Sequence, residues 1–407
     1  MITAIAGSGS FEVAEPAPLT ARGELDARLG SWAVGRWRIE EHLGSGGMSA
    51  VYGAVHRSSG KRAAVKVLHA RLAAIPDAVR RFLVEGSVAS RVDHPGAVVV
   101  FDEGLLDDGS PCIVMERLDG GGLDRLLDGR EPLPLVDAIV ILDRLLDVLA
   151  SAHLAGITHR DVKPDNVFVT THGTVKLLDF GIARDDEAVS ATQAGQIMGT
   201  PAYMPPEQAE GRWSEVDRRA DVFSVGAVAI ALLAGEPPRI CGTPNLTLLA
   251  ATSVPLRGVR ERRLEVPPAI AGVVDRAIAW SKGDRFASAS EMREALRAAW
   301  YATFGTTLEG YERRLVAIGK CLDAPLRTSG VQRTERSTAP SPTIVDRTAT
   351  MPALRLAPPP ARVERPPVRS GESPALAARR ALLVAAAAIT IVIAMLLGIG
   401  LARLLQT

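Results

Sequence analysis

A polar loop near the middle of the sequence carries the side chains with the clearest chemical meaning. Residues 159–166 read His-Arg-Asp-Val-Lys-Pro-Asp-Asn, and an Asp-Phe-Gly triplet begins at Asp179. Transfer of a phosphoryl group requires a carboxylate that receives the acceptor's proton and cations that neutralise the phosphate oxygens. Asp161 suits the carboxylate and Lys163 the cation, while Asn166 and Asp179 offer the oxygen ligands that Mg²⁺ prefers. A chance loop could hold any one of these residues but would hardly hold all of them in this order.

A glycine-rich stretch lies upstream, at residues 43–51. Its glycines would let a strand–turn–strand approach phosphate oxygens closely and offer backbone N–H groups where a Cβ would collide. A glycine-rich β-turn is more often only a turn, so this stretch carries little weight by itself. The candidate nucleotide-binding residues of the stretch are Leu43, Gly44, Ser45, Gly46, Gly47, Met48, Ser49 and Val51.

A lysine follows inside an otherwise apolar strand, at Lys66. It could be an edge-strand lysine that faces solvent, or an ammonium aimed at phosphate oxygens. The second interpretation requires a carboxylate that holds the ammonium, and Glu85 is the acid within the body of the next predicted helix. A buried pair of this kind positions a charge more than it stabilises a fold.

Two kinds of element must position these side chains. Short apolar or β-branched runs predict strands in the first part of the chain, interrupted by one helix with Asp77 as its N-cap. Longer runs follow: residues 135–154 are apolar on one face, and residues 221–233 are apolar almost all round, as in a buried helix. Strands first and helices afterwards predict an α+β fold with two unequal lobes. The predicted strands are Trp37–His42, Val51–His56, Ala63–Leu68, Val98–Glu103 and Cys112–Glu116.

Taken in order, these motifs resemble those of the eukaryotic-like (Hanks-type) bacterial Ser/Thr protein kinases. The resemblance runs from about Gly35 to Ala298 and includes the glycine-rich loop, the strand lysine, the helix glutamate, both polar motifs and a Pro-Pro-Glu triplet that ends at Glu207. It implies a two-lobed protein-kinase fold, with a β-rich N-lobe and a helical C-lobe, over residues 35–311. It also implies a non-specific serine/threonine protein kinase that acts on protein substrates with ATP and Mg²⁺, or with Mn²⁺ in its place.

The resemblance further assigns roles around the nucleotide. Met115 would be the gatekeeper, and Glu116 with Leu118 would form the hinge that binds adenine. Val51 and Ala64 would pack against the two faces of the ring. The catalytic residues would be Asp161, Lys163, Lys66 and Glu85, and the metal ligands Asn166 and Asp179.

Other implied roles concern specificity and support of the loop. Lys163, and Thr200 in the loop before the Pro-Pro-Glu triplet, would mark Ser/Thr rather than Tyr specificity. Asp221 would be the buried anchor of the catalytic loop, and Glu207 would pair with Arg285 as a structural salt bridge.

Regulation is implied by Arg160, which directly precedes Asp161. A phosphate on the activation loop would neutralise this arginine, so phosphorylation between residues 181 and 206 is expected to control activity. Thr192 occupies the position that resembles the family's autophosphorylated threonine, and Ser190 is the second choice.

The sequence departs from the family pattern at four places. Ser49 replaces the third glycine of the phosphate loop, and Pro205 replaces the usual small residue before Pro-Glu. Gly86 lies inside the predicted helix, where it should cost about 1 kcal/mol relative to alanine and make that helix mobile. Residues 237–255 differ from the usual substrate-docking region, so their structure stays open.

The two ends of the chain differ in composition from the middle. Residues 1–34 are small and polar, and we expect a flexible leader there. Residues 312–380 are expected to be a juxtamembrane linker rich in Pro, Arg, Ser and Thr. Residues 381–402 are uncharged and long enough for a single transmembrane helix, with a short tail at 403–407. Because arginines are in excess before this segment, we expect an inner-membrane protein with its kinase domain in the cytoplasm.

Composition bears on partners. The formal net charge of +1 argues against a nucleic-acid partner. The three cysteines are far apart, show no metal-ligand spacing and suit a reducing compartment better than a disulfide framework.

Two functions from different classes remain open. The first is an active membrane-anchored Ser/Thr kinase in bacterial signal transduction that phosphorylates its own activation loop. The second is a catalytically weak pseudokinase that acts as a membrane scaffold, although such proteins usually lose residues of the Lys66, Asp161 or Asp179 type. Activation is expected to depend on concentration in the membrane plane, on homodimerisation through the kinase lobes, or on a partner.

Overall fold

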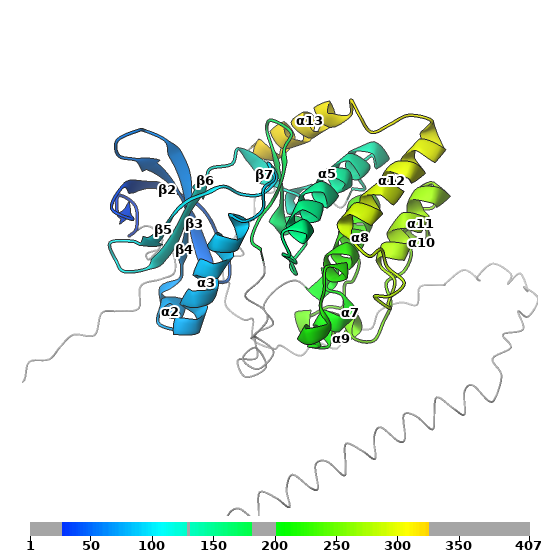
Figure 1. Cartoon of the computed structure of the whole chain (residues 1–407), viewed down its shortest axis with the longest axis horizontal. Helices are drawn as coiled ribbons and strands as arrows, with labels where there is room; N and C mark the ends of the chain where they lie inside the picture. The colour runs from blue at the N-terminus through cyan, green and yellow to red at the C-terminus, as the bar shows by residue number, and fades with distance from the viewer. Residues whose placement is uncertain (1–26, 128–130, 181–200, 325–407) are drawn as a thin grey trace, which may run out of the picture. The chain divides into compact units, whose positions relative to one another are not determined.

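Residues 27–116 fold into a six-stranded antiparallel sheet with one long helix against it. The computed structural model describes residues 27–127, 131–180 and 201–324, and Figure 1 shows this sheet in blue and cyan. The strand order is β1-β2-β3-β4-β6-β5, so β4 lies in the interior of the sheet. The strands are β1 (Trp32–Ala33), β2 (Trp37–Ser45), β3 (Ser49–His56), β4 (Arg62–Leu68), β5 (Val100–Leu105) and β6 (Pro111–Glu116), and the helices after β4 are α2 (Ala70–Ala73) and α3 (Pro76–Ala89).

Side-chain alternation along β4 explains why it is buried on both faces. Ala63, Val65 and Val67 pack into an apolar cluster that also contains Tyr52. Leu68 points to the opposite face and packs against α3 and β6. Lys66 shares this second face because side chains two residues apart on a strand point the same way.

The five predicted strands correspond to β2 through β6, with ends that differ by up to three residues. The predicted start of the long helix is wrong by two residues, because α3 begins at Pro76, with Ile75 rather than Asp77 as its N-cap. Proline suits the first helical position, since its fixed φ is already helical and its missing N–H is not needed there.

The rest of the described chain forms a mainly helical lobe with a small three-stranded sheet, β7-β8-β9. Helices α5, α8, α11 and α12 lie together at the other end of Figure 1, in green and yellow. The sheet consists of β7 (Gly120–Gly122), β8 (Val167–Thr170) and β9 (Val175–Leu177). The helices are α4 (Asp124–Leu127), α5 (Leu135–Leu154), α7 (Pro206–Ala209), α8 (Arg219–Ala234), α9 (Pro244–Ala251), α10 (Val259–Arg262), α11 (Pro268–Ala277), α12 (Ala289–Phe304) and α13 (Glu312–Asp323), with short 3₁₀ turns η1 (Pro164–Asn166), η3 (Pro201–Tyr203) and η4 (Trp213–Glu215).

Helix α8 is the core of this lobe, as its apolar composition predicts. Every residue from Ala220 to Leu233 is buried, and α5, α11 and α12 all contact it. The helix ends at Gly235, whose φ of 74° is the left-handed conformation that glycine adopts most readily after a helix. The region 237–255, left open by the sequence, contains α9, and its N-cap Thr243 accepts the backbone N–H of Leu246.

The predicted leader, residues 1–34, ends too late. Trp32 and Ala33 form β1, and the Trp32 N–H donates to Asp107 at 2.9 Å. Ala33 is fully buried, and the Arg28 side chain donates to Ser110 at 2.9 Å. Backbone pairing and side-chain contacts with distant residues therefore fix a stretch whose own composition is weakly ordering.

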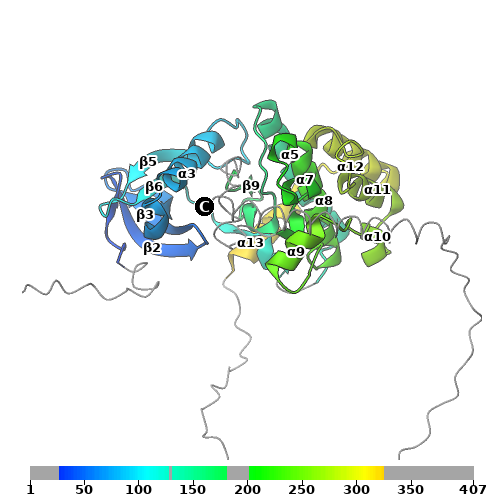
Figure 2. The ribbon, with the colours of Figure 1, turned by 90° about the horizontal axis from the view of Figure 1, so that it is seen from below.

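The predicted linker, residues 312–380, begins too early, because Glu312–Asp323 forms helix α13 (Figures 1 and 2). Leu315, Gly319 and Leu322 are buried and lie on one face of this helix, which packs against β7, β8 and α5. The prolines and arginines further on dominated the composition of the predicted segment and obscured this short amphipathic repeat.

Other predicted segments lie outside the described residues: most of the leader, the linker beyond residue 324, the membrane span at 381–402 and the tail at 403–407. Within the described ranges, none of the helices combines the length and the apolar composition that crossing a bilayer requires. The longest of them, α5, has 20 residues but includes the charged residues Asp137, Asp143, Arg144 and Asp147.

Candidate active site

A cavity of about 490 Å³ lies between the sheet, α3 and the small sheet of the helical lobe. The predicted nucleotide-binding residues line it, with the exception of Gly47 and Met48. The carbonyl oxygens of these two residues instead accept hydrogen bonds, from the Arg71 side chain and from the His69 backbone. The tip of the glycine-rich loop is therefore tied to the segment before α3, while both of its flanks face the cavity.

Several residues that line the cavity were not predicted: Gly86, Ala89, Val98, Val100, Ile113, Gly120, Phe168, Leu178 and Phe180. Ile113 could have been found, because it lies two residues before Met115 on the same strand and must share its face. Phe168 lies on β8 and reaches the cavity only because β8 pairs with β7, which follows the predicted hinge residues. No local signal in the sequence indicates that.

Lys66 is not an edge-strand lysine, since β4 pairs with β3 on one side and β6 on the other. Its ammonium lies 2.7 Å from Glu85 Oε1 and 2.7 Å from Asp179 Oδ1. The Lys66 residue is 8% exposed, whereas the Asp179 side chain is 50% exposed. Two carboxylates from different parts of the chain therefore hold one buried ammonium at the inner end of the cavity.

The protonation of this triad follows from burial and charge. Burial alone would lower the pKa of Lys66, but the nearby carboxylates of Asp179 and Glu85 outweigh it and raise that pKa above its usual value. Burial raises the pKa of Glu85 to about 7, against the opposing charge of Lys66. Burial would also raise the pKa of Asp179, but the Lys66 charge lowers it below its usual value. Lys66 is thus charged, Asp179 is ionised, and Glu85 is the member that titrates near neutral pH.

The polar loop converges on Asp161. Pro164 starts the turn η1, which brings the Asn166 amide nitrogen to 2.8 Å from the Asp161 carbonyl and 3.0 Å from its Oδ2. The Lys163 ammonium lies 3.1 Å from the same Oδ2. A carboxylate held by an amide and faced by a cation can receive a proton from a hydroxyl placed beside it.

Asp221, at the start of α8, holds this loop through hydrogen bonds to its backbone. Its Oδ1 accepts the Arg160 N–H at 2.7 Å, and its Oδ2 accepts the His159 N–H at 2.8 Å and lies 2.9 Å from His153 Nε2. Burial alone would raise the pKa of Asp221, but the hydrogen bond and charge of His153 lower it, so the group is ionised. Arg160 has φ of 65°, a strained value for a residue with a side chain, which the paired backbone bonds maintain.

The loop also contacts the Asp-Phe-Gly segment. His159 Nε2 lies 2.9 Å from the Leu178 carbonyl, and the Leu178 N–H donates to the Asn166 carbonyl at 2.8 Å. Burial lowers the pKa of His159, which is therefore neutral and donates to that carbonyl. Asp179 follows with φ of 52°. These bonds place Asn166 and Asp179, the two predicted metal ligands, on neighbouring segments.

The donor set fits a hard cation. Asn166 uses its amide nitrogen on Asp161, which leaves the amide oxygen for a metal, and the Asp179 carboxylate is ionised and half exposed at the cavity. No cluster of three or more His, Cys, Asp or Glu side chains that could hold a metal occurs in the described ranges. Two protein oxygens suffice for Mg²⁺, because it usually completes its coordination with water and phosphate oxygens.

An ion pair that the sequence did not reveal holds Glu116, the predicted hinge residue. Lys176 on β9 is buried, contacts the Glu116 carboxylate and donates to the Ala97 carbonyl at 3.0 Å. Glu116 Oε1 also accepts the Val99 N–H at 2.9 Å. The hinge residue is thus bonded to β9 and to the segment before β5. A lysine three residues before Asp179 gave no sign of a partner 60 residues away.

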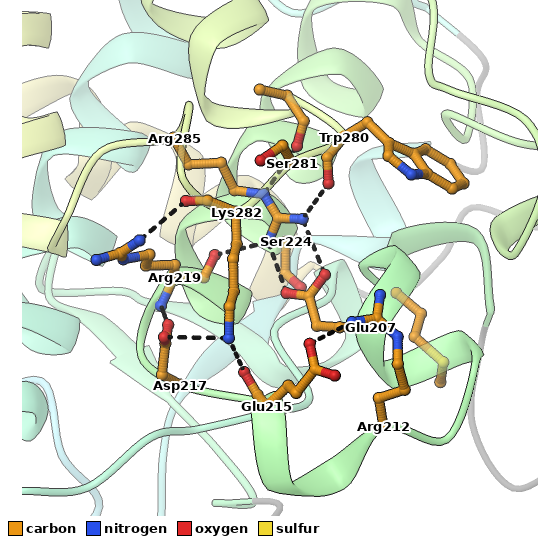
Figure 3. A network of polar contacts seen from close by, with 12 residues as sticks. Glu207, Arg212, Glu215, Asp217, Arg219, Ser224, Trp280, Ser281, Lys282 and Arg285 are labelled. Carbon is orange, nitrogen blue, oxygen red and sulfur yellow. Dashed lines mark hydrogen bonds and ion pairs between the residues drawn. The ribbon is translucent and has the colours of Figure 1, made fainter.

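Glu207 and Arg285 form the ion pair that the resemblance implies (Figure 3). The two guanidinium nitrogens lie 2.7 Å and 2.9 Å from the two carboxylate oxygens, and both residues are almost fully buried. Arg285 also donates to the carbonyls of Ala279 and Trp280. This pair joins α7 to the loop between α11 and α12.

Gly86 permits close packing of α3 against the sheet. A Cβ at this position would lie 3.0 Å from Ile113 Cδ1, so the missing side chain lets α3 approach β6 closely. That approach brings Glu85 to Lys66. Glycine lowers the stability of the helix at this position, but it also permits the close approach that forms the ion pair between Glu85 and Lys66.

Of the predicted regulatory residues, the structure describes Arg160. The carbonyl of Arg160 accepts a hydrogen bond from the Gln208 side chain at 3.0 Å, next to Glu207 on α7. Thr192, Ser190 and Thr200 lie outside the described residues.

Comparison with known proteins agrees with this geometry. The protein kinase domain family matches residues 37–255. Serine/threonine-protein kinase Pkn1 of Myxococcus xanthus is 40% identical over 270 residues, which are 65% of this chain and 38% of Pkn1. Serine/threonine-protein kinase PknB of Mycolicibacterium smegmatis is 38% identical over 64% of this chain and 42% of PknB.

Solved structures agree as well. The crystal structure of the PknI kinase domain from Mycobacterium tuberculosis superposes with a TM-score of 0.52 at 30% identity, over 65% of this chain and 95% of that domain. The chain spans less than half the length of Pkn1 and PknB. It belongs to the protein kinase family, and within it to the Hanks-type bacterial Ser/Thr kinases.

Proposed function

We propose that this chain transfers the γ-phosphate of ATP to serine or threonine hydroxyls of protein substrates. The observation that carries the proposal is the pairing of two constellations at one cavity. Lys66, held by Glu85 and Asp179, lies at its inner end, and Asp161 with its amide and ammonium partners lies on the adjoining loop. The residues of a complete phosphotransferase are therefore present and mutually oriented.

Each residue has a distinct task in this reaction. Lys66 orients the phosphates, Lys163 neutralises charge at the transferred group, and Asp161 receives the proton of the substrate hydroxyl. The hydroxyl oxygen bonds to the γ-phosphorus, and the bond between that phosphorus and the ADP oxygen breaks. Mg²⁺ at Asn166 and Asp179 would neutralise charge on the phosphate oxygens.

An autophosphorylation assay with radiolabelled Mg-ATP separates this function from that of a pseudokinase scaffold. Wild-type protein should incorporate label, and Asp161→Asn should lose nearly all of it. The matched control is Asp165→Asn, which removes an exposed carboxylate from the same loop and should keep its label. Label that survives in Asp161→Asn would remove Asp161 from its role, and nucleotide binding without label in wild type would favour the scaffold.

We also propose that residues 381–402 anchor the kinase in the inner membrane, with its lobes in the cytoplasm, for signal transduction. Support comes from the uncharged length of this segment and from the arginines before it. Deleting residues 381–407 should move the protein from the membrane fraction to the soluble fraction. An unchanged distribution would reject the anchor.

The last part of the proposal is activation by trans-autophosphorylation at Thr192, or secondarily Ser190, in a homodimer favoured by crowding in the membrane. Arg160 supports it as the cation beside Asp161 that a phosphate would neutralise. Phosphopeptide mapping should find phosphate at Thr192 in wild type and less of it after deletion of 381–407. Equal occupancy in both forms would count against crowding as the trigger.

A further inference from the structure

Helix α13 lies beyond the part of the chain that the family match covers, and it is fixed at both ends. At its start, the Arg144 guanidinium of α5 lies 2.7 Å from the Glu312 carboxylate. At its end, Asp323 Oδ1 accepts the Gly120 N–H at 3.0 Å, and Arg125 donates to the Ala324 carbonyl at 2.8 Å. The helix therefore ends at the residue where the chain leaves the hinge.

Between these ends, α13 approaches the small sheet without intervening side chains. A Cβ at Gly319 would overlap the carbonyl oxygen of Thr170 on β8. A Cβ at Gly121 on β7 would lie 2.9 Å from Leu322 Cβ, and one at Gly173 would lie 2.9 Å from a Val316 methyl. Glycines on both sides thus permit a contact that almost any other residue would prevent.

The same small sheet forms part of the nucleotide cavity. Gly120 and Phe168 both line the cavity, and their register partners across β7 and β8 are Thr170 and Gly122. Gly120 has φ of 141°, and a Cβ there would overlap the backbone of Val169. Only glycine fits this position without strain, and Asp323 accepts a hydrogen bond from its N–H.

We infer that α13 is a positioning element for the nucleotide. By holding Gly120 and the β7–β8 pair in place, it keeps one wall of the cavity in the shape that binds adenosine, and Asp323 acts through Gly120 as its positioning residue. The inference rests on the proposed function in that the ligand is a nucleotide. It assigns to a helix outside the matched family region a part in substrate affinity.

The test is binding of Mg²⁺-ATP to the full-length chain, measured as a Kd. Gly319→Leu should push α13 off the sheet, and the milder Asp323→Ala should remove only the bond to Gly120. The loss of one such hydrogen bond predicts that Kd rises about two- to tenfold in each variant. The matched control is Lys320→Leu, which puts the same side chain on the exposed side of the helix and should leave Kd unchanged.

Two further measurements separate positioning from general loss of stability. Hydrogen exchange should become faster at the Gly120 amide in both variants, and kcat at saturating ATP should stay close to the wild-type value. Leu296→Ala, in the core at α12, should lower the melting temperature without raising Kd. An unchanged Kd in Gly319→Leu despite faster exchange, or an equal rise in Leu296→Ala, would overturn the inference. Wild-type protein that binds no nucleotide would overturn the proposed function itself.

Discussion

Replacing Asp221 by asparagine tests how the catalytic loop is held. The carboxylate is fully buried, and each of its oxygens accepts a backbone N–H, from Arg160 and from His159. An asparagine amide keeps the shape but presents an NH₂ group to one of these donors. Because both oxygen positions face N–H groups, neither orientation of the amide avoids the conflict.

The size of the effect follows from the bonds and the strain. A hydrogen bond to a buried charged acceptor is worth about 1.5–3 kcal/mol, and an unpaired buried donor adds to its loss. The left-handed backbone of Arg160 stores roughly 1–2 kcal/mol, which these bonds offset. We therefore expect Asp221→Asn to lower the free energy of unfolding by about 2–4 kcal/mol. If the displaced loop raises the activation free energy by about 2.7 kcal/mol, kcat falls about a hundredfold.

The assay compares three quantities in the wild type and the variant. Steady-state kinetics with a protein substrate give kcat, nucleotide titration gives Kd, and urea unfolding gives stability. The Kd for ATP should change by less than about threefold, because Asp221 does not line the cavity.

Asp143→Asn is the matched control. Asp143 is also a buried carboxylate of the helical lobe, but it is bound by Arg293 and Arg297 of α12, away from the loop. It should lose similar stability and keep its kcat. A kcat for Asp221→Asn within threefold of wild type, or an equal fall of kcat in both variants, would refute the reasoning.

Three other predictions concern buried charges. The folded-state pKa of Glu85, raised to about 7 from 4.5, means that its contribution to stability is present below pH 4.5 and is lost as pH rises through 7. A Mg²⁺-nucleotide bound at Asp179 would neutralise that carboxylate, leave Glu85 paired with Lys66 and so lower the pKa of Glu85. The affinity for ATP should therefore rise between about pH 6 and 8. In titrations at a series of pH values, Glu85→Gln should flatten this dependence of the Kd on pH. Arg285→Lys cannot reproduce the bidentate bond to Glu207 and should lower the free energy of unfolding by about 3–5 kcal/mol, read from urea curves against an exposed Arg→Lys variant. Lys176→Met should raise the KM for ATP roughly threefold, since the hinge glutamate loses its cation, and an unchanged KM would show that backbone bonds suffice.

The part of the candidate site that is formed by residues close together in the sequence could be predicted. Asp161, Lys163 and Asn166 lie within six residues, and the turn at Pro164 brings them together almost inevitably. The strand that carries Lys66 was predicted from its apolar neighbours, but an edge position stayed open until the structure showed β4 paired with both β3 and β6. The helix α5 could be bounded because apolar residues repeat along one face from Leu135 to Leu154.

Contacts between distant residues could not be read in the same way. Gly120 and Asp323 are separated by 203 residues, and nothing in either neighbourhood indicates the other. Ala33 is buried only because the sheet edge beside it accepts a further strand. Gly86 appeared as a local cost, and its benefit became visible only when Ile113 was seen against it.

Helix α13 has a practical consequence for how the domain is cut from the chain. The family match ends at residue 255, and α10, α11, α12 and α13 follow it. A recombinant domain trimmed before Glu312 would leave bare the surface around Gly121 and Gly173 that Leu322 and Val316 cover. If α13 positions the nucleotide as inferred above, inhibitor affinities measured on such a fragment would differ from those of the longer chain. A fragment that extends through Ala324 keeps the contacts between α13 and the small sheet.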